Sequence, residues 1–320
     1  MRIGIDMGGM SIKIGLVNRK NEITARKAIP TRLAVAPKVL IADIAVAVRA
    51  LLDEEKLTIL DCEGIGIGSP GTIDNEKGVI LYSNNFGWED VDIISESKKL
   101  FAQKEDLAFA IANDADVAAL GEVCAGAAKT VDNAVLLTLG TGVGGGVILN
   151  GKIFHGAMAG GCEPGHMTIV ADGERCTCGR KGCLEAYASA SALLRMAKKG
   201  AQGNKESLLN RLCDGNPENM NGKIPFDAAA KGDAAGTAVV EEYENYLACG
   251  IANVINIFRP QMIILGGGVP AQKENLTIPL QEKVKSLCFG GSHGQIAPIV
   301  TSQLGNDAGI IGAANLIAQK

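Results

Sequence analysis

The spacing of apolar and polar residues predicts a chain in which strands and helices alternate. Apolar side chains at Ile12, Ile14 and Leu16 recur with period two, which is typical of a strand with one buried face, whereas residues 35–55 show helical spacing. We predict, in chain order, two strands around a glycine turn over 3–17, a strand over 22–29, a helix over 35–55, strands over 64–71 and 107–112, a helix over 116–127, three strands over 134–153, helices over 184–198, 225–230 and 234–257, strands over 261–265 and 296–301, and a helix over 307–318. The order favours an α/β fold built from two similar halves, and the sequence contains no low-complexity linker.

Composition narrows the class of protein. A chain of 320 residues that is 47% apolar suits one large domain or two moderate lobes. The net charge of −4 gives no support to a nucleic-acid surface. Asp6 and Lys13 interrupt the N-terminal apolar stretch, which is therefore no signal peptide, and no run approaches about 18 apolar residues. Nine cysteines without a secretory signal indicate a reducing compartment, so we expect a soluble cytoplasmic protein with no nucleic-acid or membrane partner.

Two stretches share a pattern of strand, glycine turn and strand: Asp6–Val17 and Leu139–Leu149. Glycines permit close backbone approach, and backbone amides bind phosphate without cationic side chains. One such stretch is also compatible with an ordinary hairpin, but two turns that clamp one polyphosphate explain the duplication better than packing does. Neither stretch is a Walker loop or a convincing Rossmann fingerprint. A third cluster, Gly266–Gly268, is equally compatible with a strand-to-helix joint.

Polar residues follow two of the predicted strands. Asp114 comes after the buried strand 107–112 and has an ordinary explanation as a helix cap or first-turn acid. The carboxyl end of a strand is also where open α/β sheets bind ligands. Asn85, three residues before the only tryptophan, Trp88, is compatible with a turn cap or with a ligand contact.

The stretch from Glu163 to Glu185 contains His166, Cys176, Cys178 and Cys183. Three thiolates and one imidazole are a common tetrahedral zinc set. Incidental buried cysteines and a disulfide are the alternatives, but three thiols within eight residues, among glycines and charges, favour a metal. The two glutamates are not needed by the metal, and carboxylates accept hydrogen bonds from sugar hydroxyls.

The pattern Glu-x-Gly-His followed by Cys-x-Cys-Gly-x-x-Gly-Cys-x-Glu resembles the signature of the ROK family of bacterial sugar kinases and sugar-responsive repressors. The resemblance covers essentially the whole chain. It implies an actin-like, ribonuclease-H-like fold with lobes at 1–113 plus 302–320 and at 114–301, and a cleft between them where nucleotide and sugar meet. Met10 departs from the family's Asp-x-Gly-Gly-Thr loop, in which a threonine is usual, so backbone contacts to phosphate remain possible there but a hydroxyl contact is lost.

The resemblance also implies roles for individual residues. Asp114 is the expected general base, and His166, Cys176, Cys178 and Cys183 are the expected ligands of a structural Zn²⁺ without an open position. The expected sugar-binding residues are Gly71, Asn85, Asn113, Asp114, Glu163, His166 and Glu185. The expected nucleotide-binding residues are Asp6, Gly8, Gly9, Met10, Ser11, Lys13, Gly140, Thr141, Gly142, Gly144, Gly145, Gly266, Gly267 and Gly268.

Together these features predict an ATP-dependent hexose kinase, a glucokinase that makes glucose 6-phosphate with Mg²⁺, working as a homo-oligomer (a dimer or a tetramer). Fructose, mannose, allose and N-acetylmannosamine remain alternative substrates, because the named residues would contact hydroxyls that these sugars share. A sugar-sensing repressor needs a helix-turn-helix before the first glycine turn, and a first strand near Ile3 leaves no room for one. Asp114 and both glycine turns disfavour a catalytically silent sugar-binding protein.

Overall fold

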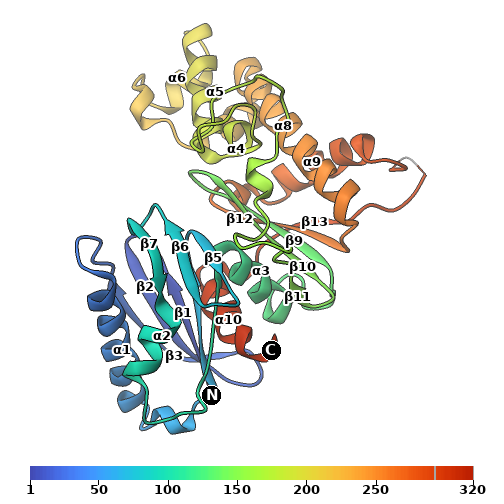
Figure 1. Cartoon of the computed structure of the whole chain (residues 1–320). Helices are drawn as coiled ribbons and strands as arrows, with labels where there is room; N and C mark the ends of the chain where they lie inside the picture. The colour runs from blue at the N-terminus through green and yellow to red at the C-terminus, as the bar shows by residue number, and fades with distance from the viewer. Residues whose placement is uncertain (292, 320) are drawn as a thin grey trace. The chain divides into compact units, whose positions relative to one another are not determined.

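The computed structural model describes residues 1–291 and 293–319, which form two compact units (Figure 1). The first unit comprises Met1–Ala134, Gly146–Cys162 and Gln303–Lys320, and the second comprises Val135–Gly145 and Glu163–Ser302. Among the described residues, no helix has the length and apolar character needed to cross a membrane.

The first unit is built on a five-stranded mixed sheet with the order β3-β2-β1-β4-β8. Its strands are β1 (Arg2–Met7), β2 (Ser11–Val17), β3 (Ile23–Pro30), β4 (Gly64–Ser69) and β8 (Ala108–Asn113). The first three pair antiparallel, whereas β1, β4 and β8 run parallel. All five strands confirm the sequence-based predictions within a few residues.

The two faces of this sheet differ because β1 and β4 alternate isoleucine with glycine. The isoleucines, such as Ile5 and Ile67, lie in a core that includes residues of α1 (Pro37–Glu54). On the glycine face, a Cβ placed on Gly4 would lie 2.0 Å from the carbonyl oxygen of Ile310, and one on Gly66 would lie 1.7 Å from that of Ala313. Helix α10 (Ala308–Asn315) therefore packs directly on the strand backbones, on the face opposite α1 (Figure 1).

Helix α3 (Asp114–Ala125) also packs closely on α10 at glycine positions. A Cβ on Gly312 would lie 1.6 Å from the carbonyl oxygen of Val117, and one on Gly121 would lie 2.2 Å from that of Ala308. This contact groups residues 114–134 with the first unit, although the boundary expected after Asn113 assigned them to the second lobe. Residues 146–162 also belong to the first unit.

A small antiparallel sheet, which the sequence did not predict, completes the first unit. It consists of β5 (Thr72–Asp74), β6 (Val79–Ser83) and β7 (Trp88–Asp92), and α2 (Ile93–Leu100) follows it. Trp88 is only 4% exposed, and its ring lies 4.9 Å from the ring of Phe86.

The second five-stranded sheet has the order β11-β10-β9-β12-β13. Its strands are β9 (Ala134–Leu139), β10 (Val143–Leu149), β11 (Lys152–Ile153), β12 (Met262–Gly267) and β13 (Ile299–Thr301). The tight turn predicted at Asn150-Gly151 is present, with both residues at positive φ. Strand β13 is shorter than the predicted range 296–301.

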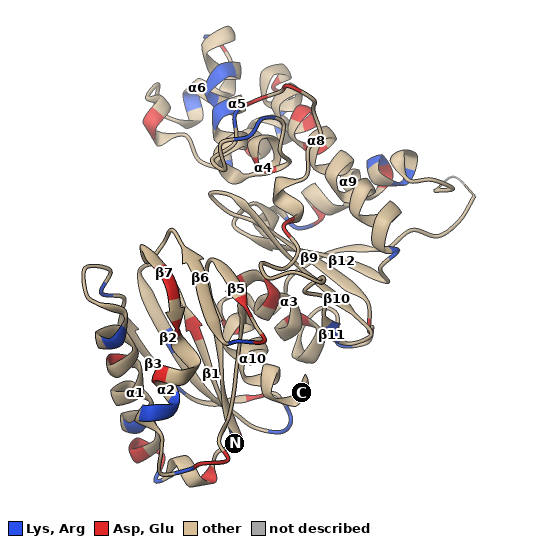
Figure 2. Cartoon of the chain, in the orientation of Figure 1, with Lys and Arg blue, Asp and Glu red and all other residues tan. Residues whose placement is uncertain are grey.

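The helices of the second unit include one correction. They are α4 (Glu185–Ala188), α5 (Ala190–Gly203), α6 (Leu208–Leu212), α7 (Ile224–Ala230), α8 (Ala234–Phe258) and α9 (Glu274–Leu287). The prediction of one helix over 184–198 was wrong, because Ser189 adopts an extended conformation and its hydroxyl caps α5 by accepting a hydrogen bond from Ala192 N–H. Helices such as α1 and α9 carry both signs of charge (Figure 2).

Candidate functional site

In the first unit, the first glycine turn joins β1 to β2. Gly8 N–H donates to the carbonyl of Ser11 at 3.1 Å, which closes the turn. Within the described chain, the N–H groups of Gly9 and Met10 donate to no protein acceptor. Two uncommitted amides in a tight turn form a concavity suited to a phosphate oxygen. The Met10 side chain is 91% exposed, so it fills no local core.

Asp6 is the penultimate residue of β1, shortly before this turn. Its carboxylate lies 3.5 Å from Lys13 Nζ, which also lies 3.4 Å from the side-chain oxygen of Asn306. Burial raises the pKa of Asp6, although the charge of Lys13 opposes the shift. A Cβ on Gly309 would lie 2.7 Å from the Asp6 carboxyl carbon, so α10 begins against this carboxylate and leaves no room for a larger residue.

Asn113 and Asp114 lie at the junction of β8 and α3. The Asn113 side chain donates to the carbonyl of Gly71 at 3.1 Å and accepts from Ala115 N–H at 2.8 Å, so it is the helix N-cap and Asp114 is the first helical residue. Gly71 has φ +121°, and a Cβ there would lie 2.3 Å from the carbonyl oxygen of Tyr82. Both roles of the Asn113 amide hold the backbone around Asp114 in place.

Asp114 has accessible surface, yet it is set deeply among protein atoms. This desolvation raises the pKa of its carboxyl, and the negative charge of Asp6 raises it further, against the hydrogen bond from Ala115 N–H. Asn85 reaches the same region, since its amide nitrogen would lie 3.7 Å from a Cβ on Gly9. The first unit therefore gathers a carboxyl with a raised pKa, a second carboxylate and a turn with free amides.

In the second unit, the second glycine turn joins β9 to β10. Gly140 N–H donates to the carbonyl of Gly142 at 3.0 Å, and Val143 N–H donates to Oε2 of Glu185 at 3.1 Å. A Cβ on Gly142 would lie 2.3 Å from the same carboxylate oxygen. Glu185, predicted as a sugar contact, thus also packs against the predicted phosphate turn.

The third glycine cluster lies beside the same turn. Gly267 has φ +94°, and a Cβ there would lie 2.5 to 2.9 Å from backbone atoms of Leu139, the residue before the turn. Gly268 has open space at the corresponding position. The structure therefore brings the second turn and the third glycine cluster together at the ends of β9 and β12, whereas the predicted Gly144 and Gly145 lie within β10.

His166, Cys176, Cys178 and Cys183 converge in the loop before α4. Their ligand atoms all lie within 4.8 Å of one another, with Cys178 and Cys183 sulfurs 3.7 Å apart and Cys176 sulfur 3.6 Å from His166 Nδ1. Zinc–sulfur bonds of about 2.3 Å at tetrahedral angles place two sulfurs about 3.8 Å apart. The four residues therefore fit a tetrahedral zinc ion. The Cys178 and Cys183 sulfurs form no disulfide, because their separation of 3.7 Å exceeds an S–S bond length of about 2.05 Å.

The thiols differ in acidity. Burial raises the pKa of Cys176 to about 12 and raises that of Cys183, whereas backbone hydrogen bonding at Arg180 lowers the pKa of Cys178. Metal binding requires the thiolate forms and releases protons, so the affinity of this site for zinc must rise with pH.

Glu185 is held by three donors. Besides Val143 N–H, it accepts from the Thr177 hydroxyl at 2.5 Å and, while Cys176 is protonated, from the Cys176 thiol at 3.3 Å. Burial alone would raise the pKa of Glu185, but these hydrogen bonds outweigh it and lower the pKa, so the group is a carboxylate at neutral pH. Sequence analysis missed Thr177; a hydroxyl residue inside the Cys-x-Cys turn was the available signal. Glu163 begins the short turn that carries His166, whose N–H donates to its carbonyl at 3.0 Å.

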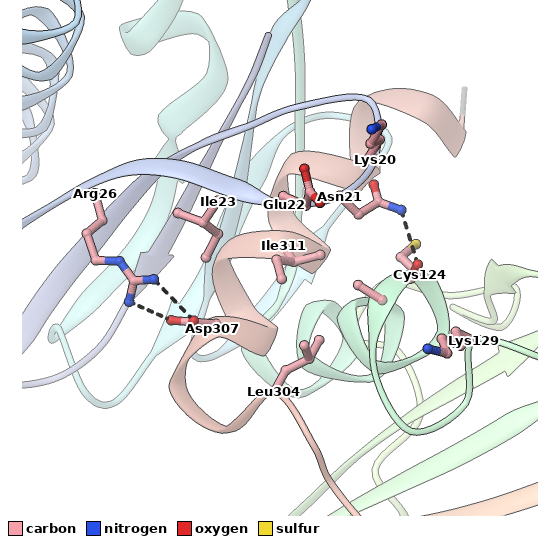
Figure 3. Close-up of a pocket in the computed structure, with 11 residues that line it drawn as sticks. Lys20, Asn21, Glu22, Ile23, Arg26, Cys124, Lys129, Leu304, Asp307 and Ile311 are labelled. Atoms are coloured by element: carbon pink, nitrogen blue, oxygen red, sulfur yellow. Dashed lines mark hydrogen bonds and ion pairs between the residues drawn. The ribbon is translucent and has the colours of Figure 1, made fainter.

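A separate hollow of about 480 Å³ lies in the first unit among the β2–β3 turn, the end of α3 and the start of α10 (Figure 3). Arg26 pairs with Asp307 at 3.1 Å across it, and Asn21 donates to the Cys124 carbonyl. None of the predicted site residues lines this hollow, so it is distinct from both turns.

Comparison with known proteins identifies the family. The model described as the ROK family matches residues 2–320. The chain belongs to the ROK family. A protein from Thermotoga maritima named glucokinase is 37% identical over 319 residues, which is 99% of this chain and 97% of the relative. The xylose repressor of Caldicellulosiruptor bescii is 31% identical over 90% of this chain and 70% of its own length.

The solved structures agree with this ROK assignment. A structure described as a ROK family glucokinase from Streptomyces griseus in complex with glucose and AMPPNP matches with a TM-score of 0.78 and 32% identity, covering 100% of this chain and 99% of that chain. The ROK chain therefore has the expected α/β, actin-like two-lobe fold class.

Proposed function

We propose that this protein is an ATP-dependent hexose kinase, a glucokinase that phosphorylates the 6-hydroxyl of D-glucose. The observation that carries the proposal is the match of almost the full chain to ROK proteins named glucokinase. The carboxyl, the two turns and the Cys/His loop to which the proposal assigns roles are all present in the chain. AMPPNP, bound in one relative, is an analogue of ATP, which supports ATP as the phosphoryl donor.

In the proposed reaction, the sugar 6-oxygen attacks the γ-phosphorus, the bond to the β–γ bridging oxygen breaks, and Asp114 takes the hydroxyl proton. The products are glucose 6-phosphate and ADP. A carboxyl with a raised pKa is a stronger base than an ordinary aspartate, which suits this role. Because phosphoryl transfer has a loose transition state, alignment and charge stabilisation contribute more than deprotonation.

We assign the stabilisation of charge to the two turns and to Mg²⁺. The free amides of Gly9 and Met10 would bind phosphate oxygens, and Asp6 would orient water on a bound Mg²⁺. In the second unit, the second turn and Gly266–Gly268 would contact the nucleotide, while Glu163, His166 and Glu185 would accept or donate hydrogen bonds to sugar hydroxyls.

We assign a structural role to zinc. Four protein ligands leave no open position, so the ion would order the loop without taking part in the chemistry. His166 turns Nδ1 toward the thiols, which leaves Nε2 for a hydrogen bond to sugar.

A coupled assay tests the proposal. Purified protein with glucose and MgATP should produce glucose 6-phosphate, detected by a dehydrogenase that reduces NADP⁺, and EDTA should stop the reaction. The same assay adapted to fructose, mannose, allose and N-acetylmannosamine, and to ADP or polyphosphate as donor, ranks the substrates. Absence of ATP-dependent phosphorylation of every hexose would refute a kinase.

The oligomeric state and a regulatory alternative need other methods. We propose a cytoplasmic homo-oligomer, a dimer or a tetramer, which light scattering of the purified protein measures directly. The repressors among the relatives raise a regulatory alternative. Sugar-sensitive shifts of promoter DNA in a gel would favour that alternative over an enzyme.

A further inference from the structure

The carbonyl groups of the first glycine turn are held by Thr31, which follows β3. The Thr31 hydroxyl donates to the carbonyl of Gly8 at 2.6 Å, and Thr31 N–H donates to the carbonyl of Met10 at 3.0 Å. Thr31 belongs to none of the glycine motifs, and 20 intervening positions separate it from Met10 in the sequence.

The second turn is held in the same way by the start of α5. The Ser191 hydroxyl donates to the carbonyl of Thr141 at 2.8 Å, and Ala190 N–H donates to the carbonyl of Gly140 at 2.8 Å. Each turn thus receives one hydroxyl and one backbone N–H from a separate segment of its own unit.

These bonds determine where the free amides point. A trans peptide is planar, so its N–H is directed opposite to its carbonyl. The Gly8 carbonyl shares a peptide with Gly9 N–H, and the Thr141 carbonyl shares one with Gly142 N–H. A hydroxyl bonded to each carbonyl therefore directs the neighbouring N–H away from the bracing side chain. Glycine peptides rotate easily, so without this bond the amide would sample other directions.

We propose that Thr31 and Ser191 are paired positioning residues, which orient the amides of the two turns for the phosphates of the nucleotide. This inference rests on the proposed kinase function. Part of the nucleotide affinity then comes from two hydroxyls outside both glycine motifs. Loss of either hydroxyl should weaken the binding of ATP far more than the binding of sugar.

Thr31→Val tests the first brace. Valine keeps the β-branched shape and the backbone N–H, and replaces only the hydroxyl with a methyl group. The expected result is a rise of about three- to tenfold in KM for ATP and in Kd for Mg-AMPPNP, measured by calorimetry, as one lost hydrogen bond implies, with KM for glucose within about twofold. Thr31→Ser restores the hydroxyl and should restore both constants. Thr24→Val is the matched control, because the hydroxyl of Thr24 on β3 donates to the Leu16 carbonyl on the adjacent strand β2, away from the turn.

Ser191→Ala tests the second brace, with Ser191→Thr as the variant that keeps the hydroxyl. Ser286→Ala is the control, since Ser286 also donates to a backbone carbonyl, that of Lys283. We expect the same selective loss of ATP affinity. Because the two braces share no partner, the double variant Thr31→Val, Ser191→Ala should multiply the two single effects.

The outcomes separate this inference from the proposed function. An active parent enzyme whose ATP constants change less than threefold in both single variants overturns the bracing roles alone. Equal losses in Thr31→Val and Thr31→Ser also overturn them, because the hydroxyl would not be the cause. A parent protein without kinase activity refutes the function, and the Kd for Mg-AMPPNP then still decides whether the hydroxyls orient the turns. If Thr31→Val does not fold, as judged by circular dichroism, Thr31→Ala against Thr31→Ser makes the same comparison.

Discussion

Asp114→Asn is the sharpest test of the proposed chemistry. Asparagine keeps the oxygen that accepts from Ala115 N–H at 3.0 Å, so the start of α3 should be preserved. It cannot accept the hydroxyl proton. Loss of a general base costs about 10²–10⁴ in turnover, or about 3–5 kcal/mol of transition-state stabilisation. We expect kcat to fall within this range while the Kd for glucose stays within about threefold.

The raised pKa of Asp114 adds two pH signatures. In the parent, kcat/KM should fall as pH drops through a pKa above the ordinary aspartate range, because only the carboxylate accepts the proton. The folded state binds this proton more tightly than the unfolded state does. The group's contribution to stability is therefore full below the unfolded pKa of about 3.9 and is lost as pH rises through the folded pKa. Asp114→Asn cannot ionise, so it should have a higher Tm than the parent at pH 7, and the gain should disappear toward pH 3.

The assay for this prediction compares Asp114→Asn with Asp92→Asn. Asp92 caps α2 by accepting from Ser95 N–H at 2.9 Å, so the control replaces an acid by an amide at another helix start of the same unit. Its kcat and Tm should stay near those of the parent, since asparagine caps helices as well as aspartate does. Turnover of Asp114→Asn within about threefold of the parent would refute the assignment of Asp114 as the base.

Three other predictions address the metal, the turn and the packing. Cys178→Ser should lower the zinc content measured by elemental analysis and lower the Tm, because a serine hydroxyl is a poor zinc ligand. It should also raise KM for glucose much more than KM for ATP, because sugar binding would then have to order the loop. An unchanged KM for glucose in zinc-depleted protein would contradict the link between the metal and the substrate. Met10→Thr should leave kcat unchanged and leave or lower KM for ATP, because the exposed Met10 side chain packs against no core, and a collapse of activity in the coupled assay would contradict this. Gly66→Ala should destabilise the first unit by about 1–3 kcal/mol in urea titrations, because its Cβ would meet the Ala313 carbonyl oxygen at 1.7 Å; Gly203→Ala, at a position with open space, is the control that should not destabilise.

Local signals explain what the sequence predicted. The residues of each glycine turn and of the Asn113-Asp114 junction lie within a few positions of one another, and the four Cys/His residues lie between positions 166 and 183, so their spacing was visible in the chain. The alternation of isoleucine and glycine in β4 likewise marks a buried strand. These features depend on backbone geometry, which short patterns encode directly.

Long-range contacts explain what the sequence did not predict. Strand β5 has three residues, too few to show a period, and it exists because β6 pairs with it. Ser189 interrupts a helical pattern because the start of α5 bonds to the second glycine turn through Ala190 and Ser191. Thr31 similarly gains its role from a partner two strands away in the chain, which no local pattern encodes.

The glycine face of the first sheet has a consequence for synthesis on the ribosome. Strand β1 is made well before α10, yet Gly4 lies against Ile310, roughly 300 residues later in the chain. At about 5–20 residues per second, β1 waits about 15–60 s for the helix that covers it. The bare backbone of these strands is exposed to other chains during that interval, while most of the second unit is already complete. A strand made long before α10 is thus covered only once α10 has been made, and a chain cut off before residue 308 would release an uncovered sheet.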